Sequence, residues 1–211
     1  MPDSKPELKE FPKKMLFTKQ TDTEVREFLN STTEIQQSFR EGDAIYLHLK
    51  PFAPDCPFTV NTALKRHGRM IVCQFYISGP IEELIYSQGS DTPGGFKEGL
   101  WHATCFELFT DLGLKYIEWN LTKDQSWTCY EFTDYRRLSK KLTKAYPRDF
   151  TIEERPGHMS IRFSLPIQGA ISALSPCCIL KLGEVFYYFA HRHVGSKPDF
   201  HLRQSFVAIN K

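Results

Sequence analysis

The chain has 211 residues, of which 41% are hydrophobic and 14% are aromatic, and this is enough apolar surface for the core of one large all-β domain. Its 27 Lys and Arg nearly balance 25 Asp and Glu, so the formal net charge is +2, whereas a dedicated nucleic-acid binder normally carries a marked basic excess. No apolar window is long enough to span a bilayer, and the N-terminal sequence lacks the apolar run of a secretory signal. We therefore expect a cytoplasmic protein with no nucleic-acid partner and no membrane partner.

The cysteines agree with this location. They stand at positions 56, 73, 105, 129, 177 and 178, and no CxxC pair occurs. Cys73, Cys105 and Cys129 fall inside strand-like runs, which favours buried thiols in a reducing cytosol over a disulfide framework. The adjacent Cys177 and Cys178 could bind a soft metal ion, but adjacency alone is a weak signal.

Residues 1–41 are predicted to form a polar lead-in and a short helical arm. Asp22 is a candidate N-cap, and two short apolar stripes follow it and end before Gly42. The stripes consist of Val25, Phe28 and Leu29 and of Ile35 and Phe39. Residues 42–211 are predicted to form the main domain.

Strand-like runs dominate after Gly42. Apolar and polar residues alternate in them, and Gly, Pro, Asn and Asp separate them. The expected strands are Ala44–Lys50, Met70–Ser78, Ile81–Tyr86, Cys105–Phe109, Tyr116–Leu121, Trp127–Phe132, Met159–Leu165, Ile179–Leu182, Val185–Ala190 and Ser205–Ile209. Residues 51–61 are expected to be a loop, and the basic residues 138–148 a loop or a short helix. About ten short strands predict an all-β, antiparallel β-sandwich that follows the helical arm.

The stretch Leu100–Arg137 holds all three tryptophans and three of these strands. A turn at 110–115 would set Phe109 opposite Tyr116, Glu107 opposite Glu118 and Cys105 opposite Asn120. The face expected in the core carries Phe106, Leu108, Ile117, Trp119, Leu121, Thr128, Tyr130 and Phe132. The opposite face is expected to carry Glu107, Phe109, Tyr116, Glu118, Asn120, Trp127, Cys129 and Glu131.

Glu107 directly opposite Glu118 requires compensation, because like charges at such positions destabilise a sheet. Basic neighbours on a plain solvent face, a cation, a protonated carboxyl or a ligand with hydroxyl groups would each supply it. Carboxylates and amides bind hydroxyl groups and a flat indole packs on a pyranose ring, so this face is typical of a carbohydrate site. Hydrolysis is an alternative, since opposed Cβ atoms ~5 Å apart resemble the carboxyl spacing of retaining glycosidases.

Complete catalytic motifs are absent from the sequence. It contains no GxSxG, SxxK, P-loop or GxGxxG. Cys105 lies near His102, but a strand cysteine with Phe106 and Phe109 as neighbours is typical of an inert thiol. A non-catalytic protein is therefore favoured over an enzyme.

The segment 191–201 reads HRHVGSKPDFH and offers another kind of site. If the strand continues, His191 and His193 lie on one side, and Asp199 and His201 could complete a site for zinc or another divalent metal ion. A histidine of this segment could instead bind haem, although no CxxCH is present for covalent attachment. The alternative is a loop in which these side chains form hydrogen bonds.

Three blocks of sequence resemble the bacterial DOMON-like family, which is related to the DOMON domains and to family 9 carbohydrate-binding modules. The blocks read GLWHATCFELF, YIEWNLTKDQSWTCYEFTDYR and YYFAHRHVGSKPDFHLRQSF, and the resemblance covers residues 42–210. It implies a jelly-roll or immunoglobulin-like β-sandwich of about ten strands. Relatives bind sugars or haem in a pocket on one sheet, so any function taken from them is a fold-level analogy. The chain departs from the family at 122–125, where a Ser-Pro-x-Gly turn is usual, and at Tyr187, where a tryptophan is usual.

Residues and resemblance together predict a non-catalytic domain that binds a carbohydrate or another small polar, polyhydroxyl ligand on one sheet face. The expected ligand-binding residues are Trp101, Glu107, Glu118, Asn120, Trp127, Tyr135, Arg136, His191, Lys197, Asp199 and His201. No cofactor and no metal ion are expected. Two alternatives stay open: a haem- or metal-binding sandwich that uses the histidines of 191–201, and a protein-interaction scaffold with no small ligand.

Overall fold

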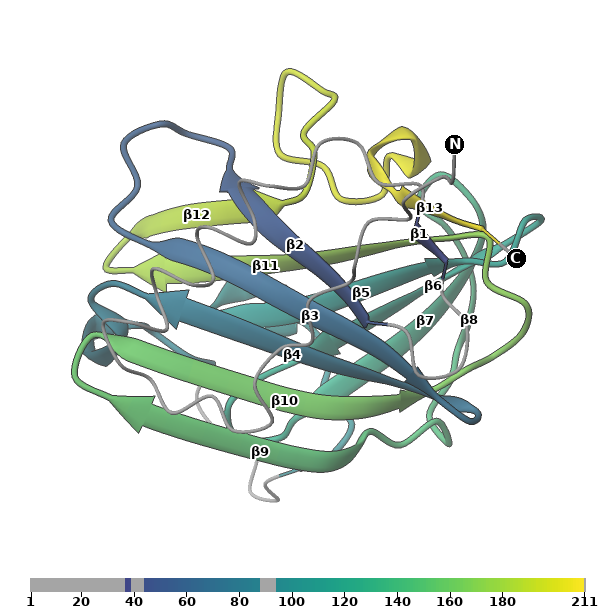
Figure 1. Ribbon diagram of the computed structural model, residues 1–211, viewed down its shortest axis with the longest axis horizontal. Helices are drawn as coiled ribbons and strands as arrows, with labels where there is room; N and C mark the ends of the chain where they lie inside the picture. Colours follow the sequence, from purple (N-terminus) through teal and green to yellow (C-terminus); the bar gives the residue numbers. More distant parts are fainter. Residues whose placement is uncertain (1–36, 39–43, 88–93, 211) are drawn as a thin grey trace, which may run out of the picture. The chain divides into compact units, whose positions relative to one another are not determined.

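The computed structural model describes residues 37–38, 44–87 and 94–210 of the chain. This part contains thirteen strands and three short 3₁₀ helices, and no α-helix. The strands are β1 (Gln37–Ser38), β2 (Ala44–Pro51), β3 (Thr59–His67), β4 (Met70–Ser78), β5 (Cys105–Asp111), β6 (Tyr116–Leu121), β7 (Trp127–Asp134), β8 (Arg137–Lys141), β9 (Arg148–Arg155), β10 (His158–Pro166), β11 (Ala173–Leu182), β12 (Val185–Ala190) and β13 (Val207–Asn210) (Figure 1). The 3₁₀ helices are η1 (Ile81–Glu83), η2 (Leu100–His102) and η3 (Arg203–Ser205). None of these described helices is long and apolar enough to cross a membrane.

The strands form one continuous sheet in the order β8-β7-β6-β5-β11-β12-β2-β3-β4-β10-β9, with antiparallel neighbours throughout. The sheet folds back between β12 and β2, where Phe189 pairs with Pro51 and Ala190 with Lys50. We call β8, β7, β6, β5, β11 and β12 the first sheet, and β2, β3, β4, β10 and β9 the second sheet. Figure 1 shows them as two layers. β13 adds an antiparallel pairing to β11 and a parallel pairing to β1.

A hydrophobic core fills the space between the two sheets. Every second side chain of β4 is buried in it. Phe75 of β4 contacts Phe106 of the first sheet and Phe163 of β10, with ring centroids 5.3 and 6.1 Å away. The predicted core residues Phe106, Leu108, Ile117, Trp119 and Leu121 are all at most 1% exposed. The prediction of an all-β, antiparallel fold is confirmed.

The six cysteines are all free thiols, and five of them are buried, as predicted. Cys178 belongs to the core, whereas Cys177 points to the opposite face of β11. Burial raises the pKa of both thiols well above their usual value. The adjacent pair is therefore protonated and directed apart, which does not suit a shared metal ion.

Several strand predictions are wrong. The segment Ile81–Tyr86 is not a strand. Its first three residues form η1 directly after Pro80, and Leu84 forms a single bridge to Leu182. The segment expected to be a basic loop contains β8 and the start of β9. Both are edge strands whose side chains are mostly exposed, so no apolar alternation marks them. The sequence also does not predict β3, an interior strand between β2 and β4, because Thr62 takes one of its buried positions.

The predicted helical arm lies outside the described residues except at its end. Gln37 and Ser38, within the second apolar stripe, form β1 rather than a helix. Their backbones pair in parallel with Ile209 and Asn210 of β13. The helical prediction is wrong at these two positions, because sheet pairing takes the backbone hydrogen bonds that a helix would use.

Candidate ligand-binding site

The outer face of the first sheet, opposite the core, carries a second buried apolar cluster. The cluster consists of Phe109, Tyr116, Tyr130, Phe132, Cys177, Ile179, Ala190, Phe200 and Phe206. Phe200 and Phe206 follow β12 and belong to residues 197–206, which we call the covering segment. Phe206 packs against Phe109 of β5 and Tyr116 of β6, and Phe200 packs against Tyr188 of β12, so the covering segment lies on this outer face.

An ion pair fastens the covering segment to the first sheet. Nε of Arg203 donates to Oδ2 of Asp111 at 2.7 Å, and its Nη2 donates to Oδ1 of Asp111 and to the carbonyl of Gly113. Asp111 ends β5 and is only 8% exposed. A two-point Arg–carboxylate contact of this kind is stronger than a single hydrogen bond and fixes the geometry of both partners.

Replacing Arg203 with glutamine is expected to lower the free energy of unfolding by about 1–3 kcal/mol, because Asp111 would stay buried without its charged partner. Urea unfolding followed by tryptophan fluorescence measures the change. Arg137→Gln, at an exposed position of β8, is the matched control and is expected to alter stability by less than about 0.5 kcal/mol. A variant at Arg203 as stable as the parent would show that the pair does not hold the segment.

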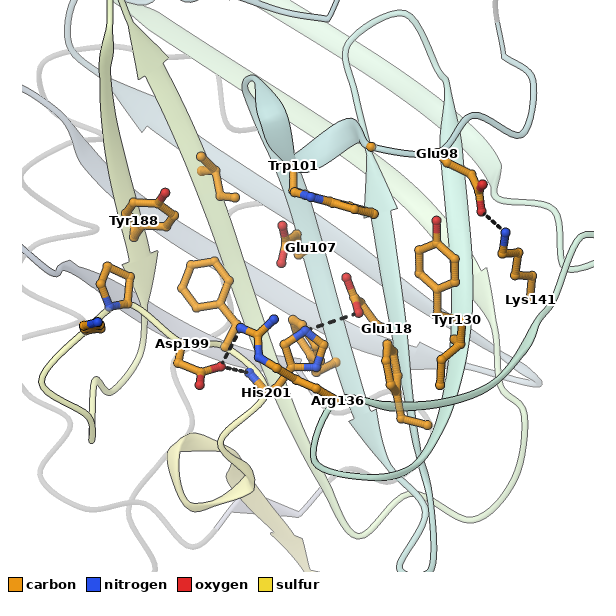
Figure 2. A pocket seen from close by; sticks show the side chains of 18 residues that line it. Glu98, Trp101, Glu107, Glu118, Tyr130, Arg136, Lys141, Tyr188, Asp199 and His201 are labelled. Carbon is orange, nitrogen blue, oxygen red and sulfur yellow. Dashed lines mark hydrogen bonds and ion pairs between the residues drawn. The ribbon is translucent and has the colours of Figure 1, made fainter.

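A cavity of about 1020 Å³ lies between the covering segment and the outer face (Figure 2). Its apolar and aromatic lining consists of Trp101, Phe109, Tyr130, Phe132, Leu138, Ile179, Tyr188, Pro198 and Phe200. Its ionisable lining consists of Glu98, Glu107, Glu118, Arg136, Lys141, Lys197, Asp199 and His201. A large apolar cavity into which a few charged groups converge is typical of a ligand-binding site.

Glu107 and Glu118 stand side by side on the floor of this cavity. Glu107 pairs with Asn120, and Phe109 pairs with Glu118, so the two acids are diagonal neighbours on β5 and β6. The prediction that they lie directly opposite each other is wrong by two residues. The reason is that β5 continues to Asp111 and the chain turns only afterwards. The face predicted for both acids is correct.

Glu118 accepts a hydrogen bond from Nδ2 of Asn120 at 2.7 Å. The thiol of Cys105 lies 3.6 Å from Oδ1 of Asn120 and orients that amide. Burial raises the pKa of Glu118 to about 7, although Asn120 and the positive charge of Arg136 act in the opposite direction. Near neutral pH the Glu118 carboxyl is therefore close to half ionised.

Glu107 is 3% exposed, and no described residue forms a hydrogen bond with its carboxyl. Its neighbours across the strands are Asn120 on β6 and Cys177 on β11. Burial and the adjacent Glu118 raise the pKa of Glu107 well above its usual value. Glu107 is thus a buried, protonated acid with a free donor and a free acceptor directed into the cavity (Figure 2).

His201 stands over Glu118 as a neutral imidazole. Burial and the charge of Arg136 lower the pKa of His201 to about 4. The hydroxyl of Tyr116 accepts from the backbone N–H of Arg136 at 3.1 Å, so its own proton is free for Nδ1 of His201 at 2.9 Å. The remaining proton of the ring is then on Nε2, which lies 3.6 Å from Oε2 of Glu118.

Asp199 joins the covering segment to the β7–β8 turn. Its carboxylate accepts from the hydroxyl of Tyr135 at 2.6 Å, from Nη2 of Arg136 at 3.0 Å and from the backbone N–H of His201 at 3.0 Å. Burial alone would raise the pKa of Asp199, but these donors lower it below its usual value. Arg136 takes a left-handed backbone conformation with φ 51°, and its side chain lines the cavity.

Most of the predicted ligand-binding residues line this cavity, namely Trp101, Glu107, Glu118, Arg136, Lys197, Asp199 and His201. Asn120 and Tyr135 lie behind them and bond to Glu118 and Asp199. The remaining two, Trp127 and His191, do not line it. The structure therefore brings together residues from three separate blocks of sequence, and their role in binding stays a prediction.

Trp127 is a core residue and not part of the cavity. It pairs with Leu121 and points toward the core, where it is 3% exposed. The predicted faces of β7 are reversed, because five residues, 122–126, connect β6 to β7 in place of the assumed tight turn. This change of one residue in the turn puts Tyr130 and Phe132 on the outer face instead.

Because of the reversed register, the sequence does not indicate Tyr130 and Phe132 as cavity residues and predicts them in the core. The local signal for the longer turn is Asp124, which accepts hydrogen bonds from Thr122 and Ser126. Glu98 and Lys141 form an ion pair at the cavity edge and come from segments far apart in sequence. Nothing in their local sequence indicates that contact.

The histidines of 191–201 do not converge with Asp199. Nε2 of His193 bonds to the carbonyl of Lys50 at 2.9 Å, whereas His201 belongs to the Glu118 side of the cavity. Nδ1 of His191 is buried without a hydrogen-bond partner among the described residues. In the part of the chain that the structure describes, no three His, Cys, Asp or Glu side chains are grouped so that they could hold a metal ion.

No protein-family model and no curated protein matches the sequence. Three solved structures are similar to the fold. One, a candidate carbohydrate-binding protein from Bacteroides uniformis, is 14% identical and has a TM-score of 0.55 over 80% of this chain and 85% of that chain. The others are a family 9 carbohydrate-binding module from Caldicellulosiruptor kristjanssonii with cellotriose (9% identity, TM-score 0.39, 75% of this chain and 80% of that chain) and with glucose (10%, 0.35, 71% and 72%). At these identities the similarity supports the fold alone. It rests on the structure from Bacteroides uniformis, whose TM-score is above 0.5.

Proposed function

We propose that this chain is a non-catalytic domain that binds a carbohydrate, or a similar polyhydroxyl ligand, in the cavity between the first sheet and the covering segment. One observation carries the proposal. Glu107 is buried beside Glu118, lacks a hydrogen-bond partner among the described residues and faces a cavity walled by aromatic rings. A carboxyl that faces the cavity without a protein partner is available to form hydrogen bonds with a ligand.

The two acids suit hydroxyl groups because they differ in protonation. The protonated Glu107 donates and accepts, while Glu118, in its ionised form, only accepts. Each hydroxyl of a sugar is both a donor and an acceptor, so neighbouring hydroxyls can bind one acid each. The family 9 modules and the DOMON-like resemblance give this proposal its context, and the related fold from Bacteroides uniformis is described as a candidate carbohydrate-binding protein.

The aromatic wall suits the apolar face of a sugar ring. Trp101 is 38% exposed, and its ring centroid lies 6.1 Å from that of Tyr130. Figure 2 shows Trp101 above the two acids, with Tyr130 and Tyr188 on either side. An indole in this position can pack on a pyranose whose hydroxyls reach the floor.

Binding is favoured over hydrolysis by the placement of the carboxyls. Glycosidases use two carboxyls that flank the scissile bond. Glu107 and Glu118 instead rise side by side from one sheet face. Incubation with the oligosaccharides that bind is therefore expected to release no new reducing ends.

The proposal is tested by calorimetric titration of the protein with a broad panel of oligosaccharides. At least one is expected to bind, and Trp101→Ala is expected to weaken it about tenfold or more without changing the unfolding midpoint. Leu114→Ala, at a side chain that is 93% exposed and outside the cavity, is the control and is expected to bind as the parent does. A folded protein that binds no member of the panel would contradict the proposal.

A further inference from the structure

A second cavity, of about 710 Å³, is bounded by the β3–β4 turn, the connection from β8 to β9 and the residues that follow β10. Its ionisable lining consists of Arg69, Lys141, Lys144 and Arg148. No acidic residue of the described chain lines it. The second cavity therefore differs from the first, which both acidic and basic side chains line.

Most of this positive charge has no ion-pair partner among the described residues. Lys141 forms an ion pair with Glu98. Arg69, Lys144 and Arg148 take part in none of the ion pairs between described residues. Like charges around one hollow repel each other, and an anion that enters relieves the repulsion. The cavity is suited to a carboxylate, sulfate or phosphate group.

The two cavities adjoin at Lys141, which lines both of them. Figure 2 shows Lys141 and its partner Glu98 at the edge of the first cavity, next to Tyr130. A ligand that lies in the first cavity and extends past Tyr130 and Lys141 therefore reaches the second. Such a ligand would have one end at the buried acids of the first cavity and the other at the cations of the second.

We propose that the ligand is an acidic oligosaccharide, with an uncharged ring in the first cavity and a carboxylate or sulfate group of a following sugar in the second. This inference rests on the proposed function. Lys144 and Arg148 receive the anion, and the ring of Tyr146, which is 60% exposed, offers a face to the sugar that carries it. Single-stranded nucleic acid fits less well, since its binders stack successive bases on several aromatic rings, whereas Tyr146 is the one aromatic residue in the described lining of this cavity.

The test uses pairs of probes in calorimetric titration: uronic-acid and sulfated oligosaccharides, each with its carboxyl-reduced or desulfated counterpart. The acidic member of a pair is expected to bind about tenfold tighter, which corresponds to about 1.4 kcal/mol. A Lys144→Gln, Arg148→Gln double variant is expected to lose this advantage and to bind the neutral member as the parent does. Sodium chloride at about 1 M, where the Debye length is ~3 Å, is expected to have the same effect.

A Lys65→Gln, Arg162→Gln double variant is the matched control, since it removes two exposed cations of the second sheet that line neither cavity. It is expected to keep the advantage. Acidic and neutral members that bind equally, or an advantage that survives in the Lys144, Arg148 variant, would overturn the inference and leave the proposed function standing. No binding by any member would overturn both. Sodium sulfate or an oligothymidylate of equal charge that binds as tightly as the acidic saccharide would assign the cavity to a simple anion or to nucleic acid, and would also overturn it.

Discussion

At pH 8 the Glu107→Gln variant is expected to unfold at a higher urea concentration than the parent, whereas at pH 4 the two are expected to unfold together. In the unfolded chain a glutamic acid ionises near pH 4.3. In the folded protein, burial and Glu118 raise the pKa of Glu107 well above that value. Above about pH 4.3 the folded state therefore binds more protons than the unfolded state, and the parent loses stability as the pH rises. Glutamine keeps the shape and does not ionise.

The neighbouring acid contributes a loss of stability of the same sign as the pH rises. The pKa of Glu118 rises from 4.5 to about 7, and each unit corresponds to about 1.4 kcal/mol, so that residue alone contributes a loss of about 3 kcal/mol between pH 4.5 and pH 7. Glu107 adds a loss in the same direction, because burial and the adjacent Glu118 raise its pKa as well. Urea midpoints at pH 4, 6 and 8 give the profile.

The matched control is Glu153→Gln, at an exposed position of β9 in the second sheet. It is expected to leave the pH profile of the parent unchanged. If Glu107→Gln shifted the midpoint equally at pH 4 and pH 8, packing rather than protonation would be the cause. That result would contradict the assignment of Glu107 as a protonated acid.

Trp127→Ala is expected to lower the free energy of unfolding by about 3–5 kcal/mol, the usual cost of removing a large buried aromatic ring. Trp127 is 3% exposed, and its ring lies 5.2 Å from Phe96, 5.6 Å from Tyr146 and 6.2 Å from Trp119, measured between ring centroids. Truncation would leave a cavity among these rings. Urea unfolding measures the loss.

Trp101→Ala is the matched control for Trp127→Ala, because the same atoms are removed from a ring that is 38% exposed. We expect the two variants to differ. Trp101→Ala lowers the affinity for neutral oligosaccharides and keeps the free energy of unfolding within about 0.5 kcal/mol of the parent, whereas the main effect of Trp127→Ala is on the free energy of unfolding. If Trp127→Ala kept the stability of the parent and lost binding, Trp127 would belong to the site, and the register of β7 would have to be revised.

The sequence predicts several interior strands well because they are long apolar or alternating runs bounded by turn residues. The runs at Met70–Ser78, Tyr116–Leu121 and Val185–Ala190 coincide with β4, β6 and β12. The edge strands β8 and β9 have no such pattern, since exposure on both faces removes the selection for alternate apolar residues. For the same reason their contribution to the cavities, through Lys141 and Arg148, could not be predicted from the local pattern.

The candidate site could be predicted in its residues but not in its geometry. Side chains alternate along β5 and β6, so Glu107, Glu118 and Asn120 lie on one face. A shift of two residues in the pairing register does not change that face. A change of one residue in the next turn has a larger effect, because it reverses every side chain of β7 and exchanges Trp127 for Tyr130. The approach of Asp199 and His201 depends on how the covering segment packs, which no local pattern specifies.

The strand order also determines when the floor of the cavity can form. Glu107 lies between Asn120 of β6 and Cys177 of β11, and β11 follows the whole second sheet in the chain. During synthesis, β5, β6 and β7 emerge early with the carboxyl of Glu107 still hydrated. The carboxyl can lose its water only once β11 lies between β5 and β12 and the covering segment lies over the face. Distant pairings of this kind form slowly, and the cost of dehydrating the acid falls on this late step. The part of the domain that is completed last along the chain is thus the part that would meet the ligand.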